Sequence, residues 1–189
     1  QEIESTVNGA QTDTKGQEKP AAEPTETSDD RIDPSEFLID HEIIEPCKTR
    51  DELCLTNEFE AAWETEINQT DVSTIDAETV SVVFGLETEK GDLELKKVDD
   101  MQVVSLDGRI LSRWPSDAAL VADVTAAHVL ESWDDAWASC TQQEQSMILA
   151  GLRIFLETCP TDGGDVVIDQ KTVDSCCQSI GAVTVTCEK

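Results

Sequence analysis

The stretch from Thr141 to Cys159, TQQEQSMILAGLRIFLETC, constrains the fold most strongly, because it is the most apolar segment of the chain. Thr141 and Glu144 stand at the spacing of a capping box, in which each side chain satisfies an amide at the helix start. The apolar residues behind this cap spread around most of a helical wheel, which indicates a helix covered on several sides. Gly151 lowers helix propensity in the middle, and we expect another backbone to pack closely there. The segment therefore predicts a central core helix, ended by Pro160.

The charge of the chain limits its partners. Asp and Glu number 41 against 13 Lys and Arg in 189 residues, which gives a formal charge of −28. Such a charge repels phosphate backbones, so we expect no nucleic-acid partner and favour a protein partner, a basic surface or a cation. No apolar run reaches the roughly 20 residues of a membrane helix, and we expect no membrane insertion. Self-repulsion of this size must be offset, and cysteines are the obvious means.

Seven cysteines predict disulfide bonds and an extracellular or other oxidising lumenal compartment. They are Cys47, Cys54, Cys140, Cys159, Cys176, Cys177 and Cys187. Three disulfides and one odd cysteine fit this number, and the pairing stays open. Cys47 and Cys54 could bond each other or reach the later cysteines, whereas adjacent Cys176 and Cys177 are expected to bond different partners. We expect the odd cysteine to be buried or to link a second chain. Without a Cys-x-x-Cys pair, a zinc site is disfavoured.

Two further features fit secretion. The sequence begins with Gln1 rather than Met, as expected of a protein whose signal peptide has been removed. Asn68-Gln69-Thr70 is an acceptor sequence for N-glycosylation, so Asn68 predicts a glycoprotein if the chain enters the secretory compartment.

Composition divides the chain into a tail and a domain. Residues 1–45 are expected to form a disordered acidic tail, since they contain much charge and little apolar surface. Its apolar residues, from Phe37 to Ile44, could dock a partner or pack on their own domain, and we favour the latter. Residues 46–189 are expected to form a single disulfide-stabilised domain.

Hydrophobic spacing predicts two helices besides the core helix. An amphipathic helix is expected over 50–67, begun by a second capping box at Thr49 and Glu52. A second helical region is expected over 115–140, with a bend near 132–135.

Alternating apolar residues and turn signals predict antiparallel strands. The predicted strands are 79–86, 93–98, 101–106, 109–113, 165–168 and 182–186. Asp107-Gly108 is a strong two-residue hairpin signal between two of them. The predicted fold is α+β, an antiparallel β-meander of four strands packed against two or three helices.

Few residues suggest chemistry. Asp162, Asp165 and Asp169 lie on or near a glycine turn and are candidate calcium ligands, although ordinary turn chemistry is the favoured account. Trp133 and Trp137 stand one helical turn apart and could line a pocket or an interface, although core packing is the plainer account. No catalytic residue and no cofactor beyond weakly bound calcium is assigned.

These observations favour a non-catalytic secreted or lumenal protein that acts by protein or cation binding within an assembly or matrix. Two alternatives stay open. One is a small-molecule-binding protein or enzyme with a pocket between the sheet and the tryptophan-bearing helix. The other is an acidic mineral- or calcium-associated matrix protein that works mainly through its tail.

Overall fold

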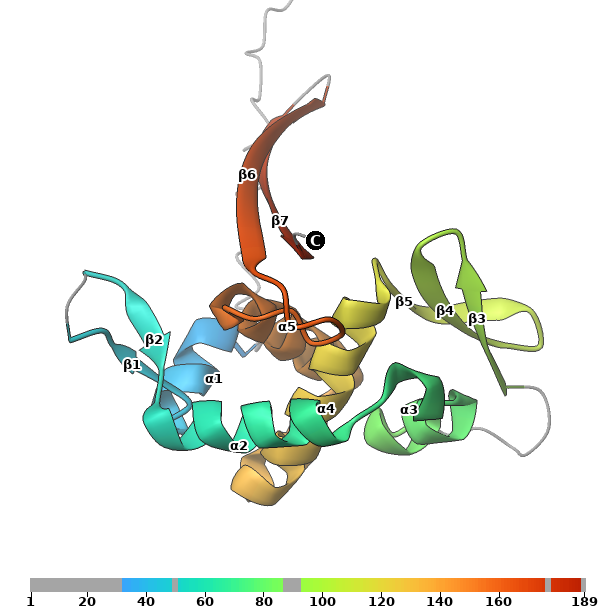
Figure 1. The fold of residues 1–189 in the computed structure, drawn as a ribbon, viewed down its shortest axis with the longest axis horizontal. Coiled ribbons are helices and arrows are strands. Elements are labelled where there is room, and N and C mark those ends of the chain that lie inside the picture. Colours follow the sequence, from blue (N-terminus) through green and yellow to red (C-terminus); the bar gives the residue numbers. More distant parts are fainter. Residues whose placement is uncertain (1–31, 49–50, 87–92, 176–177, 188–189) are drawn as a thin grey trace, which may run out of the picture. The chain divides into compact units, whose positions relative to one another are not determined.

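The structure is a computed structural model that describes residues 32–48, 51–86, 93–175 and 178–187 (Figure 1). It confirms the α+β class, with five α-helices and antiparallel sheets in these residues. The helices are α1 (Pro34–Asp40), α2 (Asn57–Gln69), α3 (Ala77–Val83), α4 (Asp117–Trp133) and α5 (Gln142–Leu152), with short 3-10 helices η1 (Val72–Thr74), η2 (Asp135–Ser139) and η3 (Arg153–Phe155). The strands are β1 (Ile44–Pro46), β2 (Leu53–Leu55), β3 (Leu93–Val98), β4 (Met101–Leu106), β5 (Arg109–Trp114), β6 (Val166–Ser175) and β7 (Gln178–Cys187).

The central helix is α4, and not the segment from Thr141 to Cys159. Eleven of the seventeen residues of α4 are buried. Its first half joins Val80, Val104 and Trp114 in one apolar cluster. Its second half joins Phe37 and Phe59 in another, where α2 crosses it (Figure 1). Because α4 is apolar on nearly every side and rich in alanine, neighbours can pack around it closely.

The start of α5 confirms the predicted capping box. The Thr141 hydroxyl accepts from the Glu144 amide, and the Glu144 carboxylate accepts from the Thr141 amide at 2.7 Å. The helix ends at Leu152, well before Cys159, and η3 follows it. The predicted close approach at Gly151 is wrong, because a Cβ added there would have no neighbour within 4 Å.

The β-meander has three strands, in the order β3-β4-β5, and not four. Asp107 and Gly108 confirm the predicted hairpin, with φ of 51° and 76°, as a two-residue turn of this kind requires. A further two-stranded sheet pairs β6 with β7, and both strands are longer than predicted.

The strand predicted over 79–86 is wrong, because most of it belongs to helix α3. The Asp76 carboxylate accepts from the Thr79 amide at 2.8 Å and caps this helix. Val80 is buried, whereas Val82 is 75% exposed. The alternation of apolar residues was therefore coincidental, and the aspartate cap was the better local signal.

The ordered part of the chain begins before the predicted boundary at residue 46. Residues 34–46 form α1 and β1, and the buried side chains of Phe37, Leu38 and Ile43 belong to the core. This part of the predicted tail packs on its own domain, as favoured, and is not disordered. Residues 1–31 lie outside the described residues.

The helix predicted over 50–67 begins later, at Asn57, and Thr56 occupies the N-cap position. The preceding residues, Leu53–Leu55, form β2, which pairs with β1. No helix begins at Glu52, which precedes this strand, and Thr49, the other residue of the expected capping box, lies outside the described residues.

Candidate binding groove

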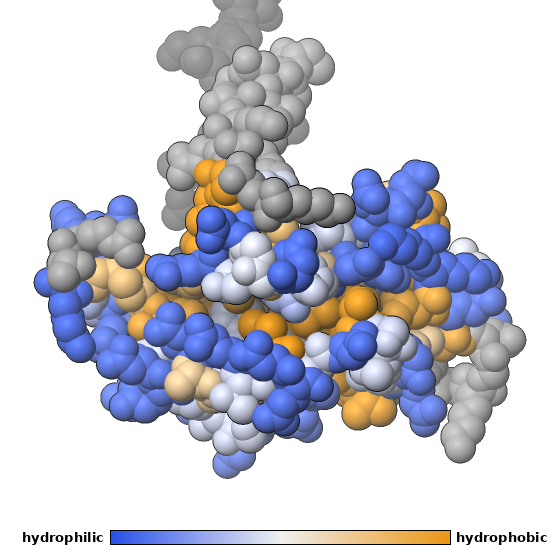
Figure 2. All heavy atoms as spheres, in the orientation of Figure 1, coloured by the Kyte–Doolittle hydropathy of each residue, from blue (hydrophilic) through white to orange (hydrophobic). Residues whose placement is uncertain are grey.

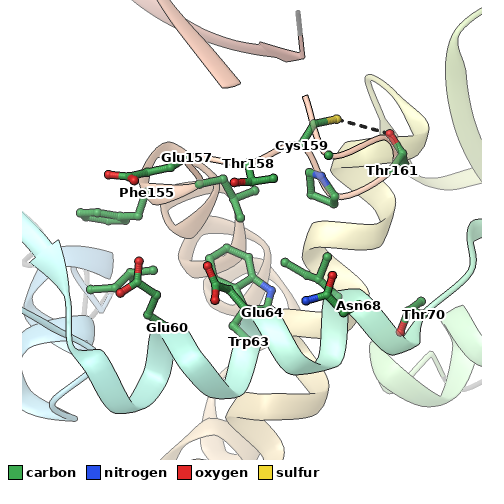
Figure 3. Close-up of a pocket in the computed structure, with 15 residues that line it drawn as sticks. Glu60, Trp63, Glu64, Asn68, Thr70, Phe155, Glu157, Thr158, Cys159 and Thr161 are labelled. Carbon is green, nitrogen blue, oxygen red and sulfur yellow. Dashed lines mark hydrogen bonds between the residues drawn. The ribbon is translucent and has the colours of Figure 1, made fainter. Parts of the chain in front are cut away.

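One face of α2 forms the first wall of a groove. Glu60, Trp63, Glu64, Ile67 and Asn68 line it, at the spacing that places side chains on one side of a helix. Figure 3 shows the labelled members of this group pointing across the groove.

Trp63 forms the floor of the groove, and helix α4 holds its side chain in place. Trp63 is 2% exposed, and its indole nitrogen donates to the Thr125 hydroxyl at 2.9 Å. That hydroxyl in turn donates to the Val121 carbonyl within α4. The tryptophan is therefore held in one orientation by a buried hydrogen bond.

The opposite wall is the segment 155–163, which begins at Phe155, the last residue of η3 (Figure 3). A tight turn holds it, in which the Cys159 amide donates to the Gly164 carbonyl at 2.7 Å and Thr158 bridges to Asp165. The disulfide between Cys159 and Cys187 joins this turn to the end of β7. Covalent and backbone bonds therefore hold this wall in place.

The groove has an apolar floor and an acidic rim. Its volume is about 430 Å³, and a shallower extension of about 360 Å³ continues past Asn68 toward Val72. Glu60, Glu64 and Glu157 line it, and no lysine, arginine or histidine is among its described lining residues. Figure 2 shows hydrophobic atoms in the middle of this face, bordered by hydrophilic ones. Its volume lies in the range of ligand sites.

A second cavity lies on the other side of the same segment. Its volume is about 880 Å³, and Leu156, Pro160 and Thr161 line both this cavity and the groove. The positively charged side chains of Lys97 and Arg153 line this cavity, and acidic side chains line it as well.

Arg153 ties this region to the central helix. Its Nε and Nη2 donate to the two carboxylate oxygens of Asp123, each at 2.6 Å. The Trp114 indole nitrogen donates to the same carboxylate at 2.9 Å. Burial raises the pKa of Asp123, and the hydrogen bonds and charge of Arg153 oppose that rise. The pair fixes the start of η3 and hence the approach to the groove wall.

The tryptophans predicted to line a pocket do not line this groove. Trp137 is buried in the core cluster, and Trp133 packs edge-on against Phe59 with centroids 5.2 Å apart. The Trp133 indole donates to the His41 carbonyl. Trp137 packs in the core and Trp133 packs against it, and a pocket or interface at these two residues stays a prediction.

Within the part of the chain that the structure describes, two cysteine pairs are joined. Cys47 bonds Cys54 across the β1-β2 hairpin, and Cys159 bonds Cys187. Cys140 is a buried free thiol whose pKa is raised by burial and by the charge of Glu144. Cys176 and Cys177 lie outside the described residues. Disulfides of this kind fit an oxidising compartment.

The structure separates the calcium candidates. Asp162 is exposed and accepts from the Gly164 amide at 3.1 Å, which is ordinary turn chemistry. Among the described residues it groups with Cys159 and Cys187 as a possible ligand set, but these two sulfurs are bonded to each other. Asp165 belongs to the β-bridge, and Asp169 lies farther along β6. Calcium binding stays a prediction.

The acceptor residue Asn68 is exposed near the end of α2, where it lines both the groove and its extension. No local pattern predicted that Trp63 and segment 155–163 would meet, because they lie far apart in the chain. The glutamate–tryptophan–glutamate spacing on α2 could have marked one wall. A single aspartate in the apolar run of α4 could have marked Asp123.

The sequence matches a known family along almost its whole described length. Residues 33–154 match the central domain of a family of unknown function, DUF8054, and residues 157–189 match its C-terminal domain. The chain belongs to the DUF8054 family. No curated protein and no solved structure matches it. Helix α2 lies in the part that matches the central domain of the family, and residues 157–163 lie in the part that matches its C-terminal domain. The groove therefore lies where the two family domains meet.

No helix within the described ranges is long and apolar enough to cross a membrane.

Proposed function

We propose that this DUF8054 chain is a non-catalytic binding protein whose groove takes a basic, apolar segment of a partner protein. The observation that carries the proposal is the acidic rim, in which three glutamates surround an apolar floor with no cation among the described lining residues. Complementary charge favours cationic partners and speeds their encounter, while apolar contacts supply affinity. The chain's charge of −28 acts in the same direction.

The dimensions suit an extended peptide. The groove follows α2, whose 13 residues span about 20 Å at 1.5 Å per residue. A strand of about six residues has the same length. The groove is open along this length. The disulfide between Cys159 and Cys187 holds one wall in place, so less conformational entropy is lost from this wall when a ligand binds.

Peptide titration tests the proposal. The probes are a ten-residue peptide of alternating lysine and leucine and a matched glutamate–leucine peptide, and binding is measured by calorimetry at 0.15 M salt. We expect the lysine peptide alone to bind. Replacement of Glu60, Glu64 and Glu157 by glutamine should weaken it about 10- to 100-fold, at roughly 0.5–1 kcal/mol per partly exposed charge.

A matched control separates the groove from the overall charge. Glu58, Glu78 and Glu131 are exposed and do not line the groove, so their replacement by glutamine removes the same charge elsewhere. We expect this control variant to bind as the wild type does. Equal weakening by both variants would mean that the peptide senses only net charge, and the proposal would be dropped.

We further propose that the protein works in the secretory pathway or outside the cell, with a glycan on Asn68. Two disulfides and an exposed acceptor asparagine support this. Expression in secreting cells, followed by enzymatic removal of N-glycans, should lower the mass of the wild type but not of an Asn68→Gln variant. An unchanged wild-type mass would count against the glycan.

A further inference from the structure

The outer face of the β-meander carries several exposed apolar side chains. Its inner face packs on α3 and α4 through Leu95, Val104 and Trp114. Since side chains alternate along each strand, the intervening residues point to the other side. Val98, Met101 and Ile110 are 48%, 38% and 46% exposed there.

This face also carries positive charge. The strand register places Lys96, Val103 and Arg113 in one row across the three strands. Lys96 pairs with Glu94 at 2.6 Å. Arg113 lies exposed on the edge strand β5 and has no carboxylate partner among the described residues. The chain has 41 acidic residues. An arginine without a carboxylate partner among the described residues, beside exposed apolar groups, is therefore available to pair with carboxylates of another molecule.

We infer that β5 of one molecule binds in the groove of a second copy of this chain. The two surfaces are complementary. β5 offers Arg113 and Ile110, and the one carboxylate in the row of Ile110, Glu94, is already paired with Lys96. The groove offers Glu60, Glu64 and Glu157 around an apolar floor, with no cation among its described lining residues. The six residues of β5 extend over about 20 Å, the length of α2 along the groove. This inference rests on the proposed function, since it names the partner of the same groove.

The contact joins two different surfaces, so it is heterologous, and the pair keeps one free groove, on one molecule, and one free β5, on the other. A six-residue strand buries less than the roughly 1,200 Å² typical of stable complexes, so the association is weak and concentration-dependent. The charge of −28 on each molecule also opposes it at low salt, where the Debye length is about 30 Å at 0.01 M compared with about 8 Å at 0.15 M.

Mixing two variants tests the inference by sedimentation equilibrium, with each protein at up to about 0.5 mM in 0.15 M salt. One variant carries Ile110→Ser and Arg113→Glu, and keeps its groove. The other carries glutamine at Glu60, Glu64 and Glu157, and keeps β5. We expect the wild-type average mass to rise past that of a dimer, each variant alone to stay monomeric, and the equal mixture to reach a dimer and no more. Lys48→Glu, an exposed lysine outside both surfaces, is the charge control and should associate as the wild type does.

Other results overturn the inference. These are a monomeric wild type at 0.5 mM, a mixture that stays monomeric, or variants that associate as the wild type does. If Arg113 serves only to keep sheet edges apart, Arg113→Val will increase association through edge pairing, which also overturns it. If the wild type binds the lysine–leucine peptide but does not self-associate, only this inference is rejected. If it binds neither the peptide nor itself, the proposed function of the groove is rejected as well.

Discussion

Replacing Arg153 by methionine tests how the buried ion pair supports the fold. The substitution leaves the Asp123 carboxylate with the Trp114 indole as its remaining hydrogen-bond donor among the described residues. The Asp123 side chain is 5% exposed, so water cannot replace the lost partner. Removing one member of a buried pair costs about 3–5 kcal/mol. Because Arg153 itself is 20% exposed, we expect the lower end, about 3 kcal/mol of unfolding free energy at pH 7.

The loss of unfolding free energy caused by Arg153→Met should become smaller as the pH is lowered. A carboxylate whose pKa is lowered on folding behaves in the opposite way, because its contribution to stability is lost at low pH. Burial raises the pKa of Asp123 above 3.8, and removal of Arg153 raises it further by removing the opposing charge and hydrogen bonds. A folded pKa above the unfolded value means that the folded state binds the proton more readily. The penalty is therefore complete above the folded pKa and disappears as the pH falls toward the unfolded value near 3.8.

Urea unfolding followed by tryptophan fluorescence, with the disulfides intact, measures both effects. Arg153→Met combined with Asp123→Asn should recover about 2 kcal/mol relative to Arg153→Met alone, since a neutral amide still accepts from Trp114. Lys97→Met is the control, because the exposed Lys97–Asp117 pair should be worth less than about 1 kcal/mol. A cost for Arg153→Met below about 1 kcal/mol at pH 7, or one that grows on acidification, would refute the reasoning.

Four further outcomes are expected. Gly151→Ala should raise the unfolding free energy by about 0.5–1 kcal/mol, because the site is open and alanine favours helix; a loss would reveal an unseen close contact. Cys159→Ser with Cys187→Ser should cost about 3.5 kcal/mol from the 28-residue separation that the disulfide closes, and an unchanged urea midpoint would contradict this. Hydrogen bonds from the Thr141 amide and hydroxyl and the Ile32 amide lower the pKa of Glu144, so its stabilisation is present above pH 4.5 and lost as the pH falls through the folded value. Glu144→Gln should therefore destabilise at pH 7 and match the wild type once the pH lies well below the folded pKa of Glu144, whereas a pH-independent difference would not fit. Salt at about 1 M should raise the melting temperature above that at 0.1 M, since screening relieves the repulsion of a −28 chain, and a constant temperature would speak against that repulsion.

Signals confined to a few neighbouring residues were predicted well. The capping box at Thr141 and the hairpin at Asp107 each depend on contacts within four residues of sequence, and both are confirmed. The prediction at 79–86 failed because the alternation of valines outweighed the aspartate cap that starts α3. The helix over 141–159 was predicted too long, since apolar residues beyond Leu152 pack in a 3-10 turn and an extended segment.

The candidate site was beyond these signals, because its parts meet only through packing. The sequence by itself determined the acidity, the disulfide chemistry, the α+β class and the cap that starts α5. The tertiary structure decided that α4, and not α5, lies at the centre, because burial depends on which neighbours surround a helix and not on its apolar content alone. It also decided that Trp63 faces segment 155–163, that Arg153 reaches Asp123, and that Trp133 and Trp137 fill the core. Such pairings are fixed by the mutual packing of elements distant in the chain, which no local pattern encodes.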